Sequence, residues 1–549
     1  MKIVNKKMTV AAGIVQVMKQ EGIDHVFAVP GESYLPLLDA LHDTPEIKLV
    51  STRHEGGASF MAEAFGKASD KPGVLMATRG VGAANLSIGV HTAYQDSTPM
   101  VVFLGQVRSD FRGREGFQEV DFEEFFAPIS KWVVEINNPK RVPELISKAF
   151  YMARSGRPGP VVVSLPEDVL AREEILTFKD YVNRPKPAIS REELGSLKQL
   201  LSKAKRPLNI AGGGVKLGKA EEALKTFAEK FSIPVMASFR RHDVFPNNHP
   251  LYVGHLGMGT REELLRTVEE ADLLLAIGTR LSEVTSQDYS LIKDSHKLVH
   301  IDIHYDSIHK VYAPEMGIVS DAKEALLDLS EMDLQADWSA WAEKCKQSFD
   351  QVSQLPAEND RIINEDVIHA MLVKLPRDTV ITNDAGNFAT WLHTYYSFNE
   401  KDTYIGPTSG AMGYALPAAL GAKLAYPKQK VLALAGDGGF MMTVQELETA
   451  VRYDIPVLVI VFNNAMYGTI RMHQEMHYPE KVIGTDLGQV SFKELAESLG
   501  AVGYTVSSKQ EFESAFQETL AKEEVAVIEV MTDQENISVN KTITQIRKK

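Results

Sequence analysis

The sequence is poor in cysteine, has no long run of apolar residues and carries no excess of positive charge. Its single cysteine, Cys345, excludes a disulfide within the chain and any metal site built from several thiolates. No segment reaches the roughly 18 uninterrupted apolar residues that a membrane-spanning helix requires. The formal net charge of -14 argues against nucleic acid, whose phosphates would be repelled. We therefore expect a soluble protein that binds neither membranes nor nucleic acid, although a local basic cleft could hold a small anion.

The remaining composition is ordinary for a globular protein. Hydrophobic residues make up 44% of the 549 residues and charged residues 24%. A chain of this length exceeds one hydrophobic core, so three domains of usual size are expected. The first residues are basic but show neither a long apolar stretch nor a plausible cleavage site, which predicts a cytoplasmic location.

Three stretches of the chain repeat one pattern: a short β-branched apolar run, a turn that contains glycine, then a helical pattern. This alternation predicts three α/β domains with doubly wound parallel sheets. We place them at residues 1–180, 190–335 and 360–549, with a proline-containing linker around 185–187. The expected strands lie within 24–31, 73–80, 99–106 and 159–166, then 207–214, 271–280 and 297–304, then 379–386, 430–439, 456–464 and 525–532.

The strongest functional motif closes two apolar strands of the third domain. One strand ends in Gly436-Asp437-Gly438, and after 24 intervening residues another ends in Asn463-Asn464. Either half alone is ordinary turn chemistry. In parallel sheets, however, ligands bind where strands end, so the two halves together predict one site.

Magnesium and a diphosphate suit this pair of strand ends. Mg²⁺ prefers a near-octahedral set of oxygen ligands. Asp437 offers a charged oxygen, Asn464 a neutral one and Met466 its backbone carbonyl. Gly436 and Gly438 allow the backbone to approach the phosphates closely. The motif resembles that of thiamine diphosphate enzymes, and the resemblance extends over the whole chain.

The nearest resemblance is to the catalytic subunit of acetolactate (acetohydroxyacid) synthases. In the segment RHEGGA, Glu55 matches the catalytic glutamate that hydrogen-bonds the aminopyrimidine of the cofactor and so activates it. Taken alone, Glu55 would be an exposed residue in the first turn of a helix. In TSGAMGYALPAALGA, Met412 matches the apolar residue that holds the bent cofactor, although methionine is also common core filler. The resemblance assigns further cofactor contacts to Gly386, Asn387, Gly410, Gly439, Tyr467 and Gly468.

The resemblance also implies a substrate end of the site, formed by two loops of the first domain. Gln118 matches the active-site glutamine, and Phe117 precedes it in REGFQEV. Gly31 and Ser33 lie in VPGESYLPLL, a loop expected over the reactive ring of the cofactor. Lys131 stands in the place of a lysine close to the substrate, but could equally be a solvated charge.

Two segments differ from the branched-chain biosynthetic enzyme. No second arginine follows shortly after Arg280, and Met472-His473 replace a Gln-Trp pair. Both missing groups shape the pocket for the second substrate, so 2-ketobutyrate is not the expected acceptor. Arg471 and His473 become candidates for holding the carboxylate of an acceptor, whereas His473 alone could also be a surface or core residue.

The central domain resembles the one that carries FAD in some relatives. The segments AGGG and GTR are compatible with a nucleotide, but such loops are weak indicators. The segment SFRRHDVF puts bulky charges where the family has small apolar residues, so FAD is a possible cofactor but not the favoured one. The resemblance also implies that Glu55 reaches a cofactor held by a second subunit, so we expect a homodimer or homotetramer; the need for a regulatory subunit is left open.

These observations predict thiamine diphosphate- and Mg²⁺-dependent decarboxylation of a 2-keto acid, with pyruvate as the first candidate. The two-carbon unit would pass to a second carbonyl, because no His-His pair of the kind that simple decarboxylases use for protonation occurs. The alternatives are a simple 2-keto acid decarboxylase, a flavin-linked pyruvate oxidase, and a non-catalytic scaffold or regulator of a true synthase. A scaffold would not need Glu55, Asp437, Asn464 and Met412 together.

Overall fold

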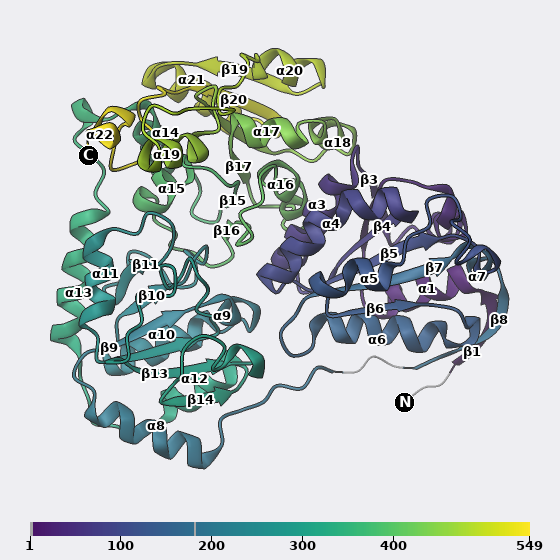
Figure 1. Cartoon of the computed structure of the whole chain (residues 1–549), viewed down its shortest axis with the longest axis horizontal. Helices are drawn as coiled ribbons and strands as arrows, with labels where there is room; N and C mark the ends of the chain where they lie inside the picture. Colours follow the sequence, from purple (N-terminus) through teal and green to yellow (C-terminus); the bar gives the residue numbers. More distant parts are fainter. Residues whose placement is uncertain (1–3, 180–182, 549) are drawn as a thin grey trace.

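The computed structural model describes residues 4–179 and 183–548, and it contains three six-stranded sheets, one in each predicted domain (Figure 1). Strands within each sheet pair in parallel and helices cover both faces, so the predicted fold class is confirmed. The domain boundaries themselves stay predictions. None of the helices in the described parts of the chain is long and apolar enough to cross a membrane.

The first domain surrounds a sheet whose central strands are almost entirely buried. In spatial order its strands are β3 (Lys48–Ser51), β2 (His25–Ala28), β4 (Gly73–Thr78), β5 (Met100–Gln106), β7 (Pro160–Pro166) and β6 (Trp132–Glu135). Its helices are α1 (Val10–Gln20), α2 (Leu35–His42), α3 (Glu55–Ala68), α4 (Arg79–Asp96), α5 (Phe122–Phe126), α6 (Val142–Arg154) and α7 (Glu167–Leu170). A separate antiparallel pair, β1 (Val4–Thr9) with β8 (Glu173–Phe178), joins the two ends of the domain.

The central domain has the same design. In spatial order its strands are β11 (Tyr252–His255), β10 (Val235–Ala237), β9 (Pro207–Ala211), β12 (Leu273–Ile277), β13 (Lys297–Asp302) and β14 (Met316–Val319). Its helices are α8 (Arg191–Lys203), α9 (Gly213–Leu217), α10 (Glu221–Phe231), α11 (Glu262–Glu270), α12 (Ala322–Glu331) and α13 (Ser339–Val352). Helix α8 begins at a capping box, in which Ser190 and Glu193 satisfy each other's backbone N–H groups.

The third domain contains the sheet that carries the predicted metal motif. In spatial order its strands are β16 (Tyr404–Ile405), β15 (Val380–Asn383), β17 (Val431–Gly436), β18 (Leu458–Asn463), β20 (Ala526–Met531) and β19 (Val502–Val506). Its helices are α14 (Ile363–Lys374), α15 (Ala389–Tyr395), α16 (Ala415–Ala425), α17 (Asp437–Thr443), α18 (Glu446–Arg452), α19 (Gly468–His477), α20 (Phe492–Ser498), α21 (Lys509–Leu520) and α22 (Ile543–Arg547).

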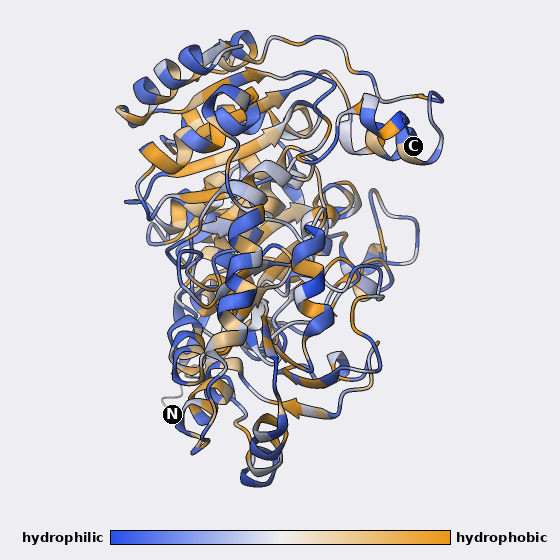
Figure 2. Cartoon of the chain, turned by 90° about the vertical axis from the view of Figure 1, so that its left-hand side faces the viewer, coloured by the Kyte–Doolittle hydropathy of each residue, from blue (hydrophilic) through white to orange (hydrophobic). Residues whose placement is uncertain are grey.

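The distribution of hydropathy explains why the strands read as continuous apolar runs. In Figure 2 the strands are mainly orange inside the molecule, and blue faces of helices lie outside them. Strand β18 is buried along its whole length, because helices lie on both faces of its sheet. Buried parallel strands therefore lose the alternation of polar and apolar residues that a one-sided sheet shows.

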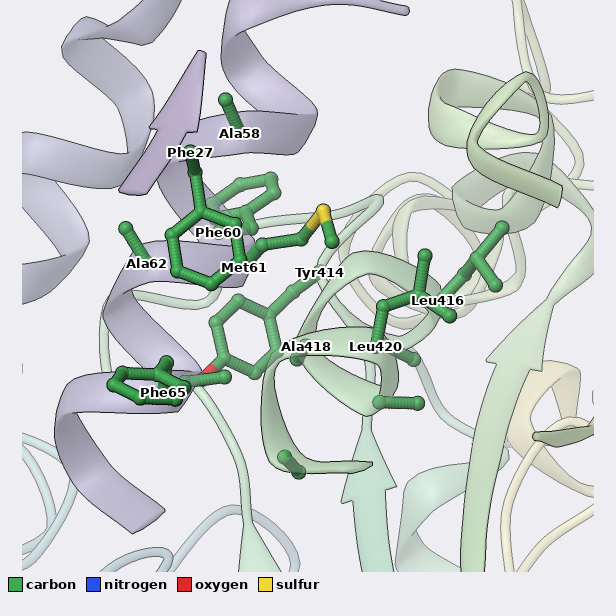
Figure 3. Packing of buried hydrophobic residues seen from close by; sticks show 14 of the residues in the cluster. Phe27, Ala58, Phe60, Met61, Ala62, Phe65, Tyr414, Leu416, Ala418 and Leu420 are labelled. Atoms are coloured by element: carbon green, nitrogen blue, oxygen red, sulfur yellow. The ribbon is translucent and has the colours of Figure 1, made fainter. Parts of the chain in front are cut away.

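Helices α3 and α16 join the first and third domains through apolar contacts (Figure 3). The rings of Phe60 and Tyr414 meet edge to face, with centroids 5.3 Å apart. Gly421 allows the two helices to approach closely, since a Cβ there would lie 2.2 Å from the carbonyl oxygen of Met61. The packing fixes helix α3, and with it Glu55, relative to the third domain.

A buried carboxylate links all three domains. Asp96 pairs with Lys67 of its own domain at 3.0 Å and with Arg241 of the central domain at 2.9 Å. It also accepts a hydrogen bond from the backbone N–H of Thr408 in the third domain at 3.1 Å. Burial opposes ionisation of Asp96, but the charges of Lys67 and Arg241 outweigh it and hold its pKa well below the usual range. Asp96 therefore remains charged and fixes the arrangement of the domains.

Candidate active site

Asp437 has the geometry of an unsatisfied metal ligand. It is the first residue of α17, directly after β17, and only 6% of its surface is exposed. One carboxylate oxygen accepts the N–H of Gly438 at 2.9 Å, whereas Oδ2 is buried and has no hydrogen-bond partner among the described residues. Burial raises the pKa of Asp437 to about 6. A cation would satisfy the unpaired oxygen and favour the charged carboxylate, so the residue fits Mg²⁺.

Asn464 lies beside Asp437, because strands β17 and β18 are paired in parallel up to their ends. The chain turns sharply after Asn464, at Ala465 with φ 52°, and Asn464 remains half-buried. The amide of the preceding Asn463 donates to Glu529 at 2.7 Å, and its oxygen accepts the N–H of Ala465 at 3.0 Å. The oxygen of Asn464 accepts the N–H of Met466 at 3.3 Å and has a second lone pair, so Asn464 and the carbonyl of the buried Met466 suit a metal.

The glycines of the motif are required by close contacts. A Cβ on Gly438 would lie 2.6 Å from the ring of Tyr467, and a Cβ on Gly439 would lie 2.5 Å from Oδ2 of Asp384. Gly468 opens helix α19 beside the same turn. Backbone N–H groups at the starts of α17 and α19 suit a phosphate, and the predicted diphosphate contacts lie at these two helix starts: Gly436, Gly438, Gly439, Tyr467 and Gly468.

The segment 384–387 supports the site from a neighbouring strand. Gly386 follows β15 and has φ 151°, a conformation that favours glycine. Asn387 uses both ends of its amide to hold other segments: it donates to the carbonyl of Ile537 at 2.9 Å and accepts from Thr469 at 2.8 Å. Asn387 thus positions the C-terminal segment over the site.

Met412 lies in a loop that precedes α16. It is half-buried, and the loop turns at Gly410 and Gly413, whose φ values are 70° and 79°. The carboxylate of Asp384 holds this loop by accepting the N–H of Gly413 at 3.0 Å and of Tyr414 at 3.3 Å. The loop thereby holds Met412 next to the end of β15.

Glu55 is the first residue of α3 and is buried, with 9% exposed. The exposed helix start that the residue alone suggested is therefore excluded. His54 caps the helix by accepting the N–H of Gly56 at 2.9 Å, and the carboxylate of Glu55 accepts a hydrogen bond from Asn85 at 2.9 Å. Burial and the charge of Glu55 raise the pKa of the nearby Tyr34. A buried carboxylate on one neutral amide is well suited to exchange a proton with a nitrogen base.

The substrate loops meet at the carboxyl end of the first sheet. Gly31 lies against Thr78, since a Cβ on Gly31 would be 2.6 Å from that of Thr78, and the hydroxyl groups of Ser33 and Thr78 are 2.7 Å apart. The carbonyl of Gln118 accepts the N–H of Gly80 at 2.9 Å, which brings the second loop to the same edge. Phe117 is 72% exposed there. The four predicted residues Gly31, Ser33, Phe117 and Gln118 thus lie together.

Lys131 does not join them. It precedes β6, and its N–H binds the carbonyl of Pro160 at the amino end of the sheet, opposite the substrate loops. Its ammonium donates to the backbone carbonyls of Met152 and Ser155. Burial and the nearby charge of Arg157 lower the pKa of Lys131 to about 8. Lys131 closes the end of a helix, and in this chain it does not lie at the predicted pocket.

Arg471 and His473 also have other contacts than those predicted. Arg471 donates to Glu475 at 2.9 Å, and Arg547 of α22 binds the same buried carboxylate at 2.6 Å. The hydrogen bond from Arg547 lowers the pKa of Glu475 to about 2, so the three charges stay paired. His473 is exposed and its ring stacks parallel to that of His477 at 6.1 Å. Arg471 therefore anchors the C-terminal helix rather than offering a free cation.

Three polar residues support the site and were not singled out from the sequence: the buried Asp384 and Glu446, and the exposed Asn85. Glu446 of α18 accepts the N–H groups of Arg53 and His54 at 3.2 and 3.1 Å, which ties the third domain to the start of α3. Asp384 follows an expected strand, so the rule that pointed to Asp437 could have found it. Asn85 and Glu446 lie within helices and carry no comparable signal.

A cavity of about 90 Å³ lies between the central domain and the other two. Its glycines pack on each other: the N–H of Gly214 binds the carbonyl of Gly278 at 2.8 Å, so AGGG has a structural role without a nucleotide. Arg241 lines the cavity and contacts Gly213, while Arg240 donates to the carbonyl of Asp384 at 3.1 Å. Arg240 thereby connects the central domain to the end of β15.

Known proteins match the chain over most of its length. Three family models match: the N-terminal TPP binding domain of thiamine pyrophosphate enzymes at residues 8–125, their central domain at 194–329 and their C-terminal TPP binding domain at 384–530. A probable acetolactate synthase large subunit of Methanocaldococcus jannaschii is 33% identical over 95% of this chain and 92% of its own. The large subunit of Haemophilus influenzae is 33% identical, and isozyme 1 of Escherichia coli 32%, each over 96% of this chain and 95% of its own. The chain therefore belongs to the thiamine diphosphate-dependent enzymes of the acetolactate synthase large-subunit family.

Proposed function

We propose that the protein decarboxylates pyruvate with thiamine diphosphate and Mg²⁺ and transfers the two-carbon unit to a second 2-keto acid. One observation carries the proposal: the buried carboxylate oxygen of Asp437 has no partner among the described residues, and Asn464 ends the adjacent strand. An unpaired buried carboxylate is costly, and an Mg²⁺-bound diphosphate would remove that cost.

Each part of the site has a role in this proposal. Bound thiamine diphosphate supplies the carbon nucleophile and the electron sink that decarboxylation of a 2-keto acid requires. Asp437, Asn464 and the carbonyl of Met466 hold the metal. Glu55, oriented by Asn85, holds and returns the proton at the aminopyrimidine nitrogen. Met412 supports the bent cofactor from the loop that Asp384 fixes.

The second step favours transfer over release of an aldehyde. The sequence has no His-His pair to act as the proton donor of simple decarboxylases. The substrate loops instead present Gly31 and Gln118 beside the exposed ring of Phe117. Without such a histidine pair, the two-carbon unit can persist until a second carbonyl arrives.

A flavin-linked oxidase is the competing function, and the cavity of the central domain bears on it. FAD is a possible cofactor there but is not favoured, because the buried Arg240 donates to the carbonyl of Asp384 and the half-buried Arg241 pairs with Asp96. Displacing both would break an ion pair and leave buried polar groups unpaired. Purified protein without a yellow chromophore is the expected result.

The site also bears on assembly. Glu55 is hydrogen-bonded within the first domain, whereas Asp437 belongs to the third, so we propose that a second copy of the chain completes each active site in a homodimer or homotetramer. The relatives are named large subunits; since all proposed catalytic residues lie in this chain, we propose that it is active without a regulatory subunit. We further propose a cytoplasmic location.

Product analysis tests the proposed function. Purified protein is incubated with pyruvate, thiamine diphosphate and Mg²⁺, and carbon dioxide, acetolactate, acetaldehyde and acetate are quantified. We expect carbon dioxide and acetolactate in a ratio near one. Acetaldehyde as the main product would identify a decarboxylase, acetate with reduced flavin an oxidase, and no carbon dioxide from any 2-keto acid a non-catalytic protein.

A further inference from the structure

Arg79 occupies an unusual position at the substrate end of the first sheet. It connects β4 to α4, and its φ of 35° lies in the left-handed region that side chains other than glycine rarely adopt. Only 9% of its surface is exposed. Strained residues of this kind persist where the surroundings hold them, and they cluster at ligand sites. A glycine would relieve the strain, so the presence of an arginine points to a use for its side chain.

The guanidinium group faces two carboxylates and one aromatic ring. Its terminal nitrogens lie 3.4 Å from Glu32 and 3.2 Å from Glu167, and its centre lies 5.9 Å from the ring centroid of Phe117. The third nitrogen, Nε, is buried and has no hydrogen-bond partner within residues 4–179 and 183–548. Arginine offers five N–H donors in one plane, so this group is under-used as it stands.

The neighbours of Arg79 in the chain are the residues that position the substrate loops. Thr78 contacts Gly31 and binds Ser33, and the N–H of Gly80 binds the carbonyl of Gln118. Arg79 thus lies between the two loops. The other candidate cation, Arg471, is bound to the fully buried Glu475, whereas the side chain of Glu32 is 70% exposed and can move away.

We propose that Arg79 binds the carboxylate of the acceptor 2-keto acid, and this assignment rests on the proposed function. The donor loses its carboxylate as carbon dioxide, so a tight ion pair there would stabilise the ground state and slow the reaction. The acceptor keeps its carboxylate in the product, and an arginine can bind it through two parallel hydrogen bonds throughout. Glu32 occupies the place of that carboxylate in this structure and would give way to it.

Five variants and two assays separate the possible roles. Carbon dioxide release from pyruvate with ferricyanide as the oxidant measures the donor step without an acceptor, and acetolactate formation measures the complete reaction. By the acceptor KM we mean the KM for pyruvate in acetolactate formation, compared with its KM in the donor assay. For Arg79→Gln and Arg79→Lys we expect the acceptor KM to rise about ten- to hundred-fold, the usual effect of losing a charged hydrogen bond. For Glu32→Gln we expect that KM to fall about threefold, because a competing charge is removed. Arg141→Gln, which removes a surface pair with Glu144, is the matched control.

In Arg79→Gln the carboxylate of Glu32 loses its partner and could itself repel the acceptor. The double variant Arg79→Gln/Glu32→Gln removes that charge as well, and its acceptor KM should stay raised if the loss of binding to Arg79 is the cause. Equal changes in the donor and acceptor steps, or an unchanged acceptor KM in a folded Arg79→Gln, would overturn the assignment of Arg79 alone. A higher acceptor KM in Glu32→Gln would also contradict it, and this variant does not depend on the strained position. Wild-type protein that forms no acetolactate would instead refute the proposed function.

Discussion

Replacing Asp437 with asparagine should stabilise the cofactor-free protein while destroying its cofactor site. Burial raises the pKa of Asp437 from its usual 3.8 to about 6, so the folded protein holds an unfavourable charge at neutral pH. A difference of about two between folded and unfolded pKa values corresponds to about 3 kcal/mol in the free energy of unfolding. Asparagine removes the charge and can still accept the hydrogen bond from Gly438.

The pH dependence gives the effect a signature. Because the pKa of Asp437 is higher in the folded state, ionisation of its carboxyl group lowers the free energy of unfolding. The full effect is present above about pH 6, the folded pKa, and is absent below about pH 4, the unfolded pKa. The variant should therefore be more stable than wild type at pH 8, and the difference should disappear towards pH 4. Chemical unfolding of both proteins without thiamine diphosphate or Mg²⁺, at several pH values, measures the difference.

The cofactor supplies the opposite readout. Asp437→Asn should lose Mg²⁺-dependent binding of thiamine diphosphate in calorimetric titration, and wild-type affinity should fall about tenfold per pH unit below pH 6, where the carboxyl is protonated. Equal free energies of unfolding for the two proteins at pH 8 would show that the buried charge of Asp437 does not destabilise the folded protein. Unchanged affinity of the variant would show that Asp437 is not a metal ligand.

Three further outcomes follow from the structure. Glu55→Gln should bind thiamine diphosphate normally in calorimetry but lose about 10²-fold or more in turnover, and near-normal activity would remove Glu55 from the mechanism. Asp96→Asn should lower the free energy of unfolding by about 3 kcal/mol or more, because Lys67 and Arg241 lose their buried partner, and an unchanged denaturation midpoint would contradict this. In an equimolar mixture, pyruvate should be preferred to 2-ketobutyrate as acceptor, because the extra methylene of 2-ketobutyrate can contribute only about 1–3 kcal/mol and needs a shaped pocket to do so. A strong excess of the ethyl-bearing product would restore the biosynthetic assignment.

Most interior strands of the fold were predictable and the edge strands were not; the exception is the interior strand β10, which was not expected and is only three residues long. Eleven of the strands were expected from apolar runs, including β17 and β18, because strands that are buried on both faces must be apolar throughout. Edge strands such as β3 and β16 are short and partly polar, so no run marks them. The antiparallel pair of β1 and β8 depends on a contact between distant parts of the chain, and its residues are largely exposed.

The residues of the site also fall into a group that the sequence predicts and a group that it does not. Asp437 and Asn464 were visible because each ends an apolar strand, and adjacent parallel strands must end together. Side chains placed by helix packing were not visible: Lys131 and Arg471 resemble pocket residues in the sequence, yet each is held by a nearby helix terminus or carboxylate. The strained conformation of Arg79 has no signal in the sequence at all.

Mixed dimers test the central claim that Glu55 of one subunit acts on a cofactor held by Asp437 of another. Subunits with Glu55→Gln and with Asp437→Ala are co-expressed under different affinity tags, and dimers that contain one of each are purified. A shared site predicts that one of the two sites in each mixed dimer carries neither change, so about half of the wild-type rate of acetolactate formation should return. A rate no higher than that of either variant alone would show that each site is built within one chain, and would contradict the account.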